Sequence, residues 1–208
     1  METERQNDEY FSFFAMLDRM QYINRWGLMR NTKTENNKEH TMDVAVVSHA
    51  LVLIRNRFFP GSEPAIDPLF AAAVGLFHDA TEIITGDLPT PVKYKNREIT
   101  SSYKEIEKQA KERLLTLLPN ELRDDYRRLF SPDMANPVES AAVELVKAAD
   151  KICAYIKCVL EEKAGNREFC VAKEAIYEAI LKINLPEVDY FMEHFVPSYG
   201  QTLDQISG

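Results

Sequence analysis

Glycine and cysteine are both scarce in this chain. Only 7 of its 208 residues are glycine and 3 are cysteine. The sequence also lacks segments in which Val, Ile or Thr alternate with polar residues between turn signals, the pattern typical of half-buried strands. Apolar residues recur at helical spacing instead. The sequence therefore predicts an all-α fold, and its length suits one compact helical bundle that forms a single domain over residues 1–208.

The cysteines and the N-terminus point to the cellular compartment. Cys153, Cys158 and Cys170 are odd in number and lack the CxxC spacing of zinc sites. The N-terminus METERQNDEY is polar, unlike a secretory signal, and no run approaches the roughly 20 apolar residues of a membrane helix. We expect a reduced, cytoplasmic protein without a membrane partner, in which Cys153 and Cys158 are small core residues.

Positive charge is in deficit. Lys and Arg number 25 against 33 Asp and Glu, which gives a formal net charge of −8. A surface that binds duplex nucleic acid needs clustered positive charge. We therefore expect no nucleic acid duplex as a partner, and any nucleotide ligand should be a small molecule.

Apolar spacing also predicts where the helices lie. The segment LFAAAVGLF is apolar on all sides, as in a helix at the centre of a bundle. Phe11, Phe14, Leu17 and Met20 fall on one face of the first predicted helix. Proline, glycine and polar runs mark the connections. The predicted helices cover residues 7–24, 37–57, 69–77, 101–118, a short stretch after Pro119, 138–163, and one or two further segments at the C-terminus.

Four polar residues fall on or beside these apolar faces. His40 lies at the end of the apolar seam of the second predicted helix. His78 and Asp79 end the most hydrophobic helix, where burial is costly unless such groups are paired or coordinated. Asp150 lies on the core-facing side of the helix over residues 138–163. All four side chains are therefore expected to face inward.

Two imidazoles and two carboxylates suit one divalent cation, such as Co, Mn, Mg, Fe or Zn, and leave positions for water or substrate. His78 and Asp79 can share an ion only at a helix end, because neighbouring side chains point about 100° apart. Singly, each residue has an ordinary alternative: Asp150, for example, could pair with Lys147 or Lys151. The combination of the dyad with a separate His and a separate Asp favours the metal site.

The remaining histidines, His49 and His194, are interpreted as ordinary core residues with hydrogen-bond partners, because that is the commoner role of a single histidine on a helix.

An upstream His, an HD dyad and a distal Asp on a helical scaffold resemble the HD-domain metal-dependent phosphohydrolases. More specific are NRWGLMRNTKTENNKEH, LFHDATEIITGDLPTPVKY and LVKAADKICAYIKC. With ERLLTLLPNELRD and DYFMEHFVPS, these segments resemble the bacterial 5′-deoxynucleotidases of that superfamily over nearly the whole chain. The resemblance implies an HD-domain bundle, a homodimer, and hydrolysis of deoxyribonucleoside 5′-monophosphates to deoxyribonucleoside and phosphate. The metal ligands that it implies are the same four residues, His40, His78, Asp79 and Asp150.

The resemblance also implies substrate contacts. Arg25 would bind phosphate and assist catalysis, and Trp26 would stack or pack, although the only tryptophan of the chain could equally be a core residue. Asp79 and Asp150 would also touch the substrate. The GDLPTP loop would contact the sugar, the alternative being a plain turn. Its residues in that role are Asp87, Leu88, Pro89 and Thr90.

Glu82 lies four residues after His78, on the same face if the helix continues for one turn. The resemblance implies that it is a catalytic acid or base acting on a metal-bound water. The alternative is a solvated charge near a helix end.

Two other functions stay open from the sequence. One is a nucleotide sensor that holds metal and ligand with little turnover. The other is hydrolysis of nucleoside triphosphates or cyclic nucleotides, because one scaffold can host several phosphoryl reactions.

Overall fold

The computed structural model describes residues 10–89, 93 and 95–208, and the elements formed by these residues are all helices. The strand-like pairing within this part of the chain is a single antiparallel bridge between Asn24 and Asn36. The prediction of an all-α fold is confirmed. The α-helices are α1 (Phe13–Asp18), α2 (Asn37–Phe58), α3 (Pro68–Phe77), α4 (Glu82–Thr85), α6 (Arg97–Leu115), α7 (Asn120–Phe130), α8 (Pro137–Lys163), α9 (Cys170–Leu181), α10 (Pro186–His194) and α11 (Leu203–Ile206), with 3-10 turns η1 (Arg19–Tyr22), η2 (Arg167–Phe169) and η3 (Val196–Gly200).

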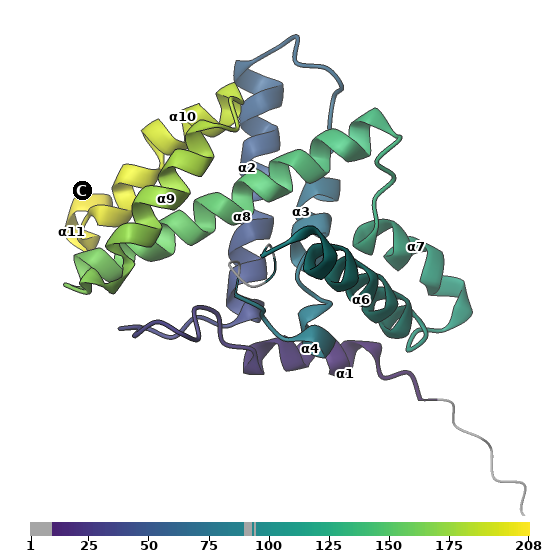
Figure 1. Ribbon diagram of the computed structural model, residues 1–208. Helices are drawn as coiled ribbons and strands as arrows, with labels where there is room; N and C mark the ends of the chain where they lie inside the picture. Colours follow the sequence, from purple (N-terminus) through teal and green to yellow (C-terminus); the bar gives the residue numbers. More distant parts are fainter. Residues whose placement is uncertain (1–9, 90–92, 94) are drawn as a thin grey trace, which may run out of the picture.

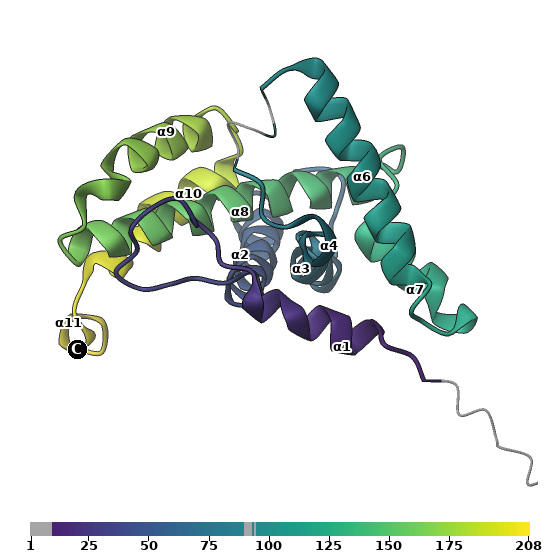
Figure 2. The ribbon, with the colours of Figure 1, turned by 60° about the horizontal axis from the view of Figure 1, so that its bottom comes forward.

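Helices α2 and α3 lie side by side and α8, which is 27 residues long, crosses them (Figure 1). Helices α9 and α10 flank one half of α8, whereas α6 and α7 lie on the opposite side, beyond α3 (Figures 1 and 2). Because α2 and α3 run in opposite directions, the start of α2 lies beside the end of α3. Helix α1 and the short helix α4 lie at that same end (Figure 1).

Side-chain caps fix where the central helices begin. The Asn36 side chain accepts from the backbone N–H of Glu39, whose carboxylate accepts in turn from the backbone of Asn36, a capping box that starts α2. Helix α8 is capped by Asn136 and begins with a proline at its first position. The predicted ranges 37–57 and 138–163 agree with these helices to within one residue.

The buried apolar side chains form two clusters. The larger lies between α2, α3, α8 and α10 and includes Ala71 and Val74 of α3. The smaller joins α1, α6 and α7 and includes Ala80 in the turn after α3, with Phe77 packed against it. His78 and Asp79 therefore lie where the two clusters meet. The single domain over residues 1–208 stays a prediction.

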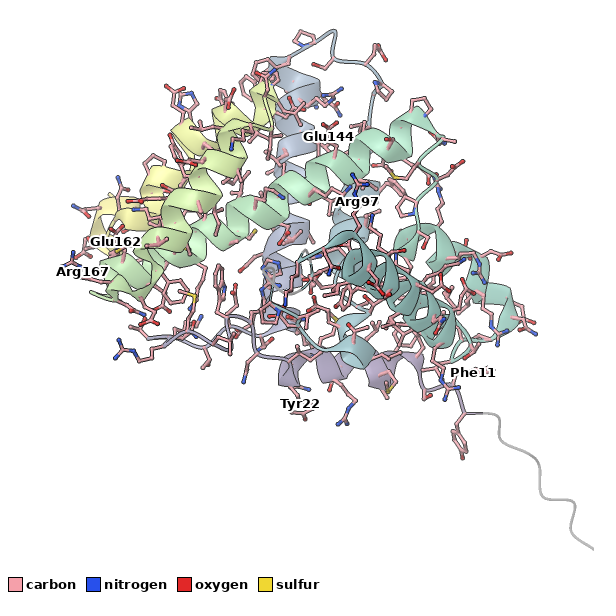
Figure 3. All side chains as sticks on the ribbon, viewed as in Figure 1. Phe11, Tyr22, Arg97, Glu144, Glu162 and Arg167 are labelled. Carbon is pink, nitrogen blue, oxygen red and sulfur yellow. The ribbon has the colours of Figure 1, made fainter. Side chains whose placement is uncertain are left out.

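The first helix differs from the prediction. It begins at Phe13 and changes to a 3-10 turn after Asp18. Phe13 is buried, with its ring centroid 4.9 Å from that of Tyr126 in α7, whereas Phe14 is largely exposed. Phe11 precedes the helix; both it and Tyr22 are exposed at the outer edge of the molecule, at separate places (Figure 3). Of the predicted face, Met20 is buried and Leu17 packs against the smaller cluster, whereas packing against α7 buries Phe13 in place of Phe11 and Phe14.

The wholly apolar segment is also less central than expected, because Leu69 and Leu76 of α3 are exposed while Ala71 and Val74 are buried. Helix α6 begins at Arg97, four residues before the predicted start, where Asn96 caps it. None of the described helices combines the length and the apolar character needed to cross a membrane.

Two cysteines, Cys153 and Cys158, and the two remaining histidines were also predicted to be core residues. Cys153 and Cys158 are buried and free, as predicted. His49 is half-buried. His194 is exposed at the end of α10, with its ring 4.3 Å from that of Tyr190, so its prediction as a core residue is wrong.

Candidate metal centre

The start of α2 and the end of α3 bring two histidines together. The ring centroids of His40 and His78 are 5.4 Å apart. Asp150, from the middle of α8, places Oδ1 3.0 Å from His40 Nε2. One potential ligand atom from each of these three residues lies within 4.8 Å of the other two. Residues that are 110 positions apart in the chain thus meet at one point.

Asp79 completes the group. Its Oδ2 lies 3.1 Å from His78 Nε2 and 3.9 Å from His40 Nε2. Because α3 ends at Phe77, the dyad lies in the turn beyond the helix, as sharing one ion requires. The structure brings all four predicted ligands together, and we call His40, His78, Asp79 and Asp150 the His/Asp cluster.

The His78 ring is oriented for a cation. Its Nδ1 lies 2.7 Å from the carbonyl oxygen of Gly75, and because a carbonyl can only accept, Nδ1 must donate. Nε2 is then the ring nitrogen left to bind an ion: it is buried, lies 3.1 Å from Asp79 Oδ2 and makes no hydrogen bond with the described residues. A buried unpaired nitrogen beside carboxylates fits a metal ion. The residues present therefore suit a divalent cation.

Gly75 also lets α3 approach α2 closely, because a Cβ at this position would lie 3.0 Å from the Cα of Ala45. The cluster depends on this approach, since the two helices carry His78 and His40.

The electrostatics of the cluster favour positive charge. Burial alone would lower the pKa of His78, but the charges of Asp79 and Asp150 outweigh it and raise the pKa to about 9. Burial would raise the pKa of Asp150, yet its hydrogen bond with His40 and the charge of His78 hold that pKa well below its usual range. The same charges would stabilise a divalent cation that replaced the proton on His78 Nε2.

The four side chains differ in exposure, which shows where the site opens. His40 is fully buried, His78 and Asp79 are 15% and 19% exposed, and Asp150 is 39% exposed. Water and ligands can therefore reach the cluster from the side of Asp150.

Arg25 reaches the cluster from the segment before α2. Its Nη1 donates to Asp79 Oδ2 at 3.0 Å, and Nη2 lies 3.9 Å from Asp150 Oδ1. Trp26 is half-buried beside it. The indole Nε1 donates to Glu35 at 3.1 Å, and the ring packs edge-on against Phe169. Arg25 therefore touches two members of the cluster, whereas Trp26 packs next to it.

Glu82 is positioned at the site by a different helix from the one predicted. Helix α3 does not continue through it, since a turn follows Phe77 and Glu82 begins α4. The Asn37 side chain donates to Glu82 Oε2. Burial and the charge of Asp79 raise the pKa of Glu82 to about 8, although the bond from Asn37 opposes the shift. Glu82 is thus a half-buried acid held by Asn37, not a solvated charge.

Residues 87–89 follow α4 and are half-buried. Burial raises the pKa of Asp87, and the charge of Arg25 opposes that rise, so the two groups share one electrostatic environment. Thr90, predicted with them, lies outside the described residues. Asp150 faces His40 and Arg25, and neither Lys147 nor Lys151 forms an ion pair with it in the described chain.

The sequence reasoning missed Glu35. Its Oε2 accepts from Trp26 and lies 3.7 Å from Arg25 Nε, while Oε1 lies 3.8 Å from His40 Nδ1. Glu35 precedes α2 in a polar loop, so no apolar periodicity marks it. The available signal was its position five residues before an inward-facing histidine.

The fold and the cluster define a class of protein, the HD-domain phosphohydrolases. An HD-domain phosphohydrolase of Listeria innocua superimposes with a TM-score of 0.72, at 21% identity over 90% of this chain and 88% of that chain. An HD phosphohydrolase of cyanophage S-2L, bound to dA and one catalytic Zn²⁺ ion, superimposes with a TM-score of 0.58, at 23% identity over 90% of this chain and 96% of that chain. At such identities the likeness is one of fold.

The sequence identifies the family within that class. Residues 12–199 match the model of the YfbR-like 5′-deoxynucleotidases. A 5′-deoxynucleotidase of Shewanella oneidensis is 50% identical over 195 residues, which are 93% of this chain and 96% of the relative. A 5′-deoxynucleotidase of Erwinia tasmaniensis is 48% identical over 195 residues, 94% of this chain and 96% of the relative. The chain belongs to the YfbR-like 5′-deoxynucleotidase family, as the resemblance implied.

Proposed function

We propose that this protein hydrolyses deoxyribonucleoside 5′-monophosphates to deoxyribonucleoside and phosphate, and that the His/Asp cluster holds one divalent cation for the reaction. The convergence of the buried His78 Nε2 with His40 and with the carboxylates of Asp79 and Asp150 carries the metal assignment. The family, in which the similar proteins are 5′-deoxynucleotidases, supports the reaction. A bound cation would supply an acidified water and polarise the phosphoryl group.

Arg25 binds and orients the phosphate. A guanidinium suits two parallel hydrogen bonds to phosphate oxygens, and this one lies against Asp79 and Asp150 at the open side of the cluster. The contacts with the two carboxylates hold Arg25 in place before substrate arrives. Both carboxylates therefore also border the substrate.

Glu82 holds or moves a proton at its carboxylate, because it is half-buried and fixed by Asn37 beside the dyad turn. Residues Asp87, Leu88, Pro89 and Thr90 contact the sugar, and Trp26 packs on the nucleoside side. The sugar contact is supported by Asp87, which is half-buried: burial raises its pKa, and the charge of Arg25 opposes that rise. Co, Mn, Mg, Fe and Zn all suit the cluster, and the cyanophage protein of the same fold holds Zn²⁺.

The reaction is tested by measuring phosphate release from paired deoxyribo- and ribonucleoside 5′-monophosphates, with each of these ions and with a chelator. We expect release from the deoxy substrates, which chelation abolishes and added ion restores. Release that is indifferent to chelation would contradict the metal mechanism, and pyrophosphate or triphosphate release from nucleoside triphosphates would point to another reaction.

The ligand set is tested by Asp150→Ala. We expect loss of both ion binding and phosphate release, because the variant removes one of the four members of the His/Asp cluster. Asp124→Ala is the matched control, since that aspartate is fully exposed on α7. An active Asp150→Ala protein would remove Asp150 from the ligand set.

Two further expectations belong to this proposal, a cytoplasmic location and a homodimer. Three free cysteines support the first. Exposed apolar side chains on the outer face of α2, namely Met42, Val46 and Leu53, support a contact between two copies. Sedimentation at several concentrations tests the dimer, and a protein that stays monomeric throughout would contradict it.

A further inference from the structure

Two segments before α2 pair with each other and bring Glu35 to the cluster. The backbone N–H of Arg25 donates to the carbonyl of Glu35 at 2.9 Å, and that of Asn37 donates to the carbonyl of Ile23 at 3.0 Å. This pairing places the Glu35 side chain between the Arg25 segment and the first turns of α2, where His40 lies.

The two oxygens of Glu35 serve different neighbours. Oε2 accepts from Trp26 Nε1 at 3.1 Å and lies 3.7 Å from Arg25 Nε, while Oε1 lies 3.8 Å from His40 Nδ1. Arg25 Nε and His40 Nδ1 are both buried and lack a hydrogen-bond partner among the described residues. One carboxylate thus faces two buried donors that nothing else in the described chain satisfies.

The chemistry of His40 requires such an acceptor. If His40 binds an ion through Nε2, which faces Asp150 and Asp79, its ring proton must lie on Nδ1. Histidine ligands of metals commonly donate that second N–H to a carboxylate or a carbonyl, which fixes the ring. His78 uses the carbonyl of Gly75 for this purpose. The acceptor facing His40 Nδ1 is Glu35.

Trp26 adds a second observation. Its φ of 58° lies in the left-handed region, which is uncommon for a bulky side chain and persists only where the surroundings hold it. The hydrogen bond to Glu35 and the contact with Phe169 hold the indole, and Asn31 donates to the Trp26 carbonyl at 3.3 Å. Glu35 is therefore one of the groups that keep this residue in place.

We propose that Glu35 is a positioning residue that couples ion binding at His40 to the orientation of Arg25 and Trp26. This inference rests on the proposed function, because it needs an ion at the cluster and a substrate at Arg25. A carboxylate can accept on both sides, whereas the amide of glutamine offers one oxygen and one NH₂ group. Glu35→Gln can therefore satisfy only one of the two sides while keeping the size of the side chain.

Trp26 provides the measurement, since it is the only tryptophan in the chain. Metal-stripped protein is titrated with Zn²⁺, a d¹⁰ ion without redox chemistry, while tryptophan emission and zinc affinity are recorded. In the wild type we expect emission to change and to saturate as the ion binds. In Glu35→Gln we expect affinity to fall by about 10- to 100-fold and emission to stay unchanged even at saturation.

Glu168→Gln is the matched control, because Glu168 pairs with Arg30 of the same N-terminal segment at an exposed position. It should titrate as the wild type does. Thermal unfolding of the metal-free proteins checks that the Glu35 variant is folded. If it is not, Glu35→Asp replaces it, since a shorter carboxylate keeps its charge but cannot reach both sides.

The proposal is overturned if the Glu35 variant shows both the zinc affinity and the emission response of the wild type. It is also overturned if the emission of the wild type does not change at saturating zinc. Phosphate release measured in parallel separates the two proposals. A wild type that binds zinc with an emission change but releases no phosphate contradicts the proposed reaction and still supports the positioning role. An active wild type with an unaffected Glu35 variant contradicts the positioning role alone.

Discussion

Glu82 and Asn37 show how single side chains prepare this site. Asn37 is fully buried in the first turn of α2, and its amide donates to the Glu82 carboxylate across the gap to α4. The bond fixes the direction of a carboxyl group that burial would otherwise leave without a partner. Orientation of this kind is what a group needs if it is to transfer a proton in the reaction.

The role of Glu82 is tested by Glu82→Gln. We expect kcat to fall by about 10²- to 10⁴-fold, the range lost with a positioned acid or base, while affinity for the ion changes little. Steady-state phosphate release and a metal titration provide the two measurements. Glu98→Gln, at an exposed position on α6, is the control. A variant that loses ion affinity in proportion to rate would instead make Glu82 part of the ion's surroundings.

At the level of elements, an ion pair joins the C-terminal half of α2 to α10. Arg55 Nη1 donates to Glu187 Oε1 at 2.8 Å, Nη2 donates to the Glu63 carbonyl, and the Glu187 side chain is fully buried. Removing one member of a buried pair leaves the other charge without compensation, which is far more costly than losing an exposed pair.

We therefore expect Glu187→Ala to lower the free energy of unfolding by about 3–5 kcal/mol. Glu112→Ala is the comparison, because it breaks the half-exposed pair with Arg127 and should cost only about 0–1 kcal/mol. Urea unfolding of the three proteins measures both. Equal effects of the two substitutions would show that the pair between α2 and α10 contributes no more than a surface contact.

The elements differ in how far their sequences predict them. Helices α2 and α8 were predicted to within a residue because each carries a continuous apolar face and is bounded by polar or proline-containing segments, which are local signals. The start of α1 was not predicted, because it depends on the contact between Phe13 and Tyr126 of α7, which are more than a hundred residues apart in the chain. The end of α3 at Phe77 was predicted, but the helix does not continue for one turn to Glu82. Glu82 has helical spacing from His78, and tertiary structure overrides that spacing.

The residues of the candidate site also divide into those that a local sequence signal marks and those that only tertiary contacts reveal. His40, His78, Asp79 and Asp150 were predicted because a charged or polar residue on an apolar face is unusual. Glu35 lies in a polar loop, where an acidic residue is ordinary, and only its contacts with Arg25, Trp26 and His40 reveal it.

Across the whole molecule, Glu161 of α8 ties the N-terminal segment to the C-terminal half. Its carboxylate accepts from Thr32 at 2.8 and 2.7 Å and from Asn166 at 2.8 Å, and it pairs with Lys157. Although burial opposes it, these bonds lower the pKa of Glu161 below its ordinary value of 4.5. Glu161 thus fastens the loop that continues into Glu35.

A carboxylate whose pKa is lower in the folded than in the unfolded protein stabilises the fold above the unfolded value, and the gain is lost as pH falls below it. The stability difference between wild type and Glu161→Gln should therefore be constant above about pH 5 and shrink below 4.5. Urea unfolding at a series of pH values measures it. A pH-independent difference would contradict the prediction.

The His/Asp cluster draws its members from α2, the turn after α3, and α8, so an ion there would join the three segments that carry the larger buried cluster. Anything that binds only the folded state stabilises it, by about 2.7 kcal/mol at a hundredfold excess over Kd. For a chain of this length, each kcal/mol raises Tm by roughly 2–4 °C. We therefore expect added Zn²⁺ or Mn²⁺ to raise Tm by several degrees, and a chelator to reverse the gain. The Tm of Asp150→Ala should not change with the ion, whereas the Tm of Asp124→Ala should respond as that of the wild type does. A wild-type Tm that changes with neither ion nor chelator would exclude an ion site that links these helices.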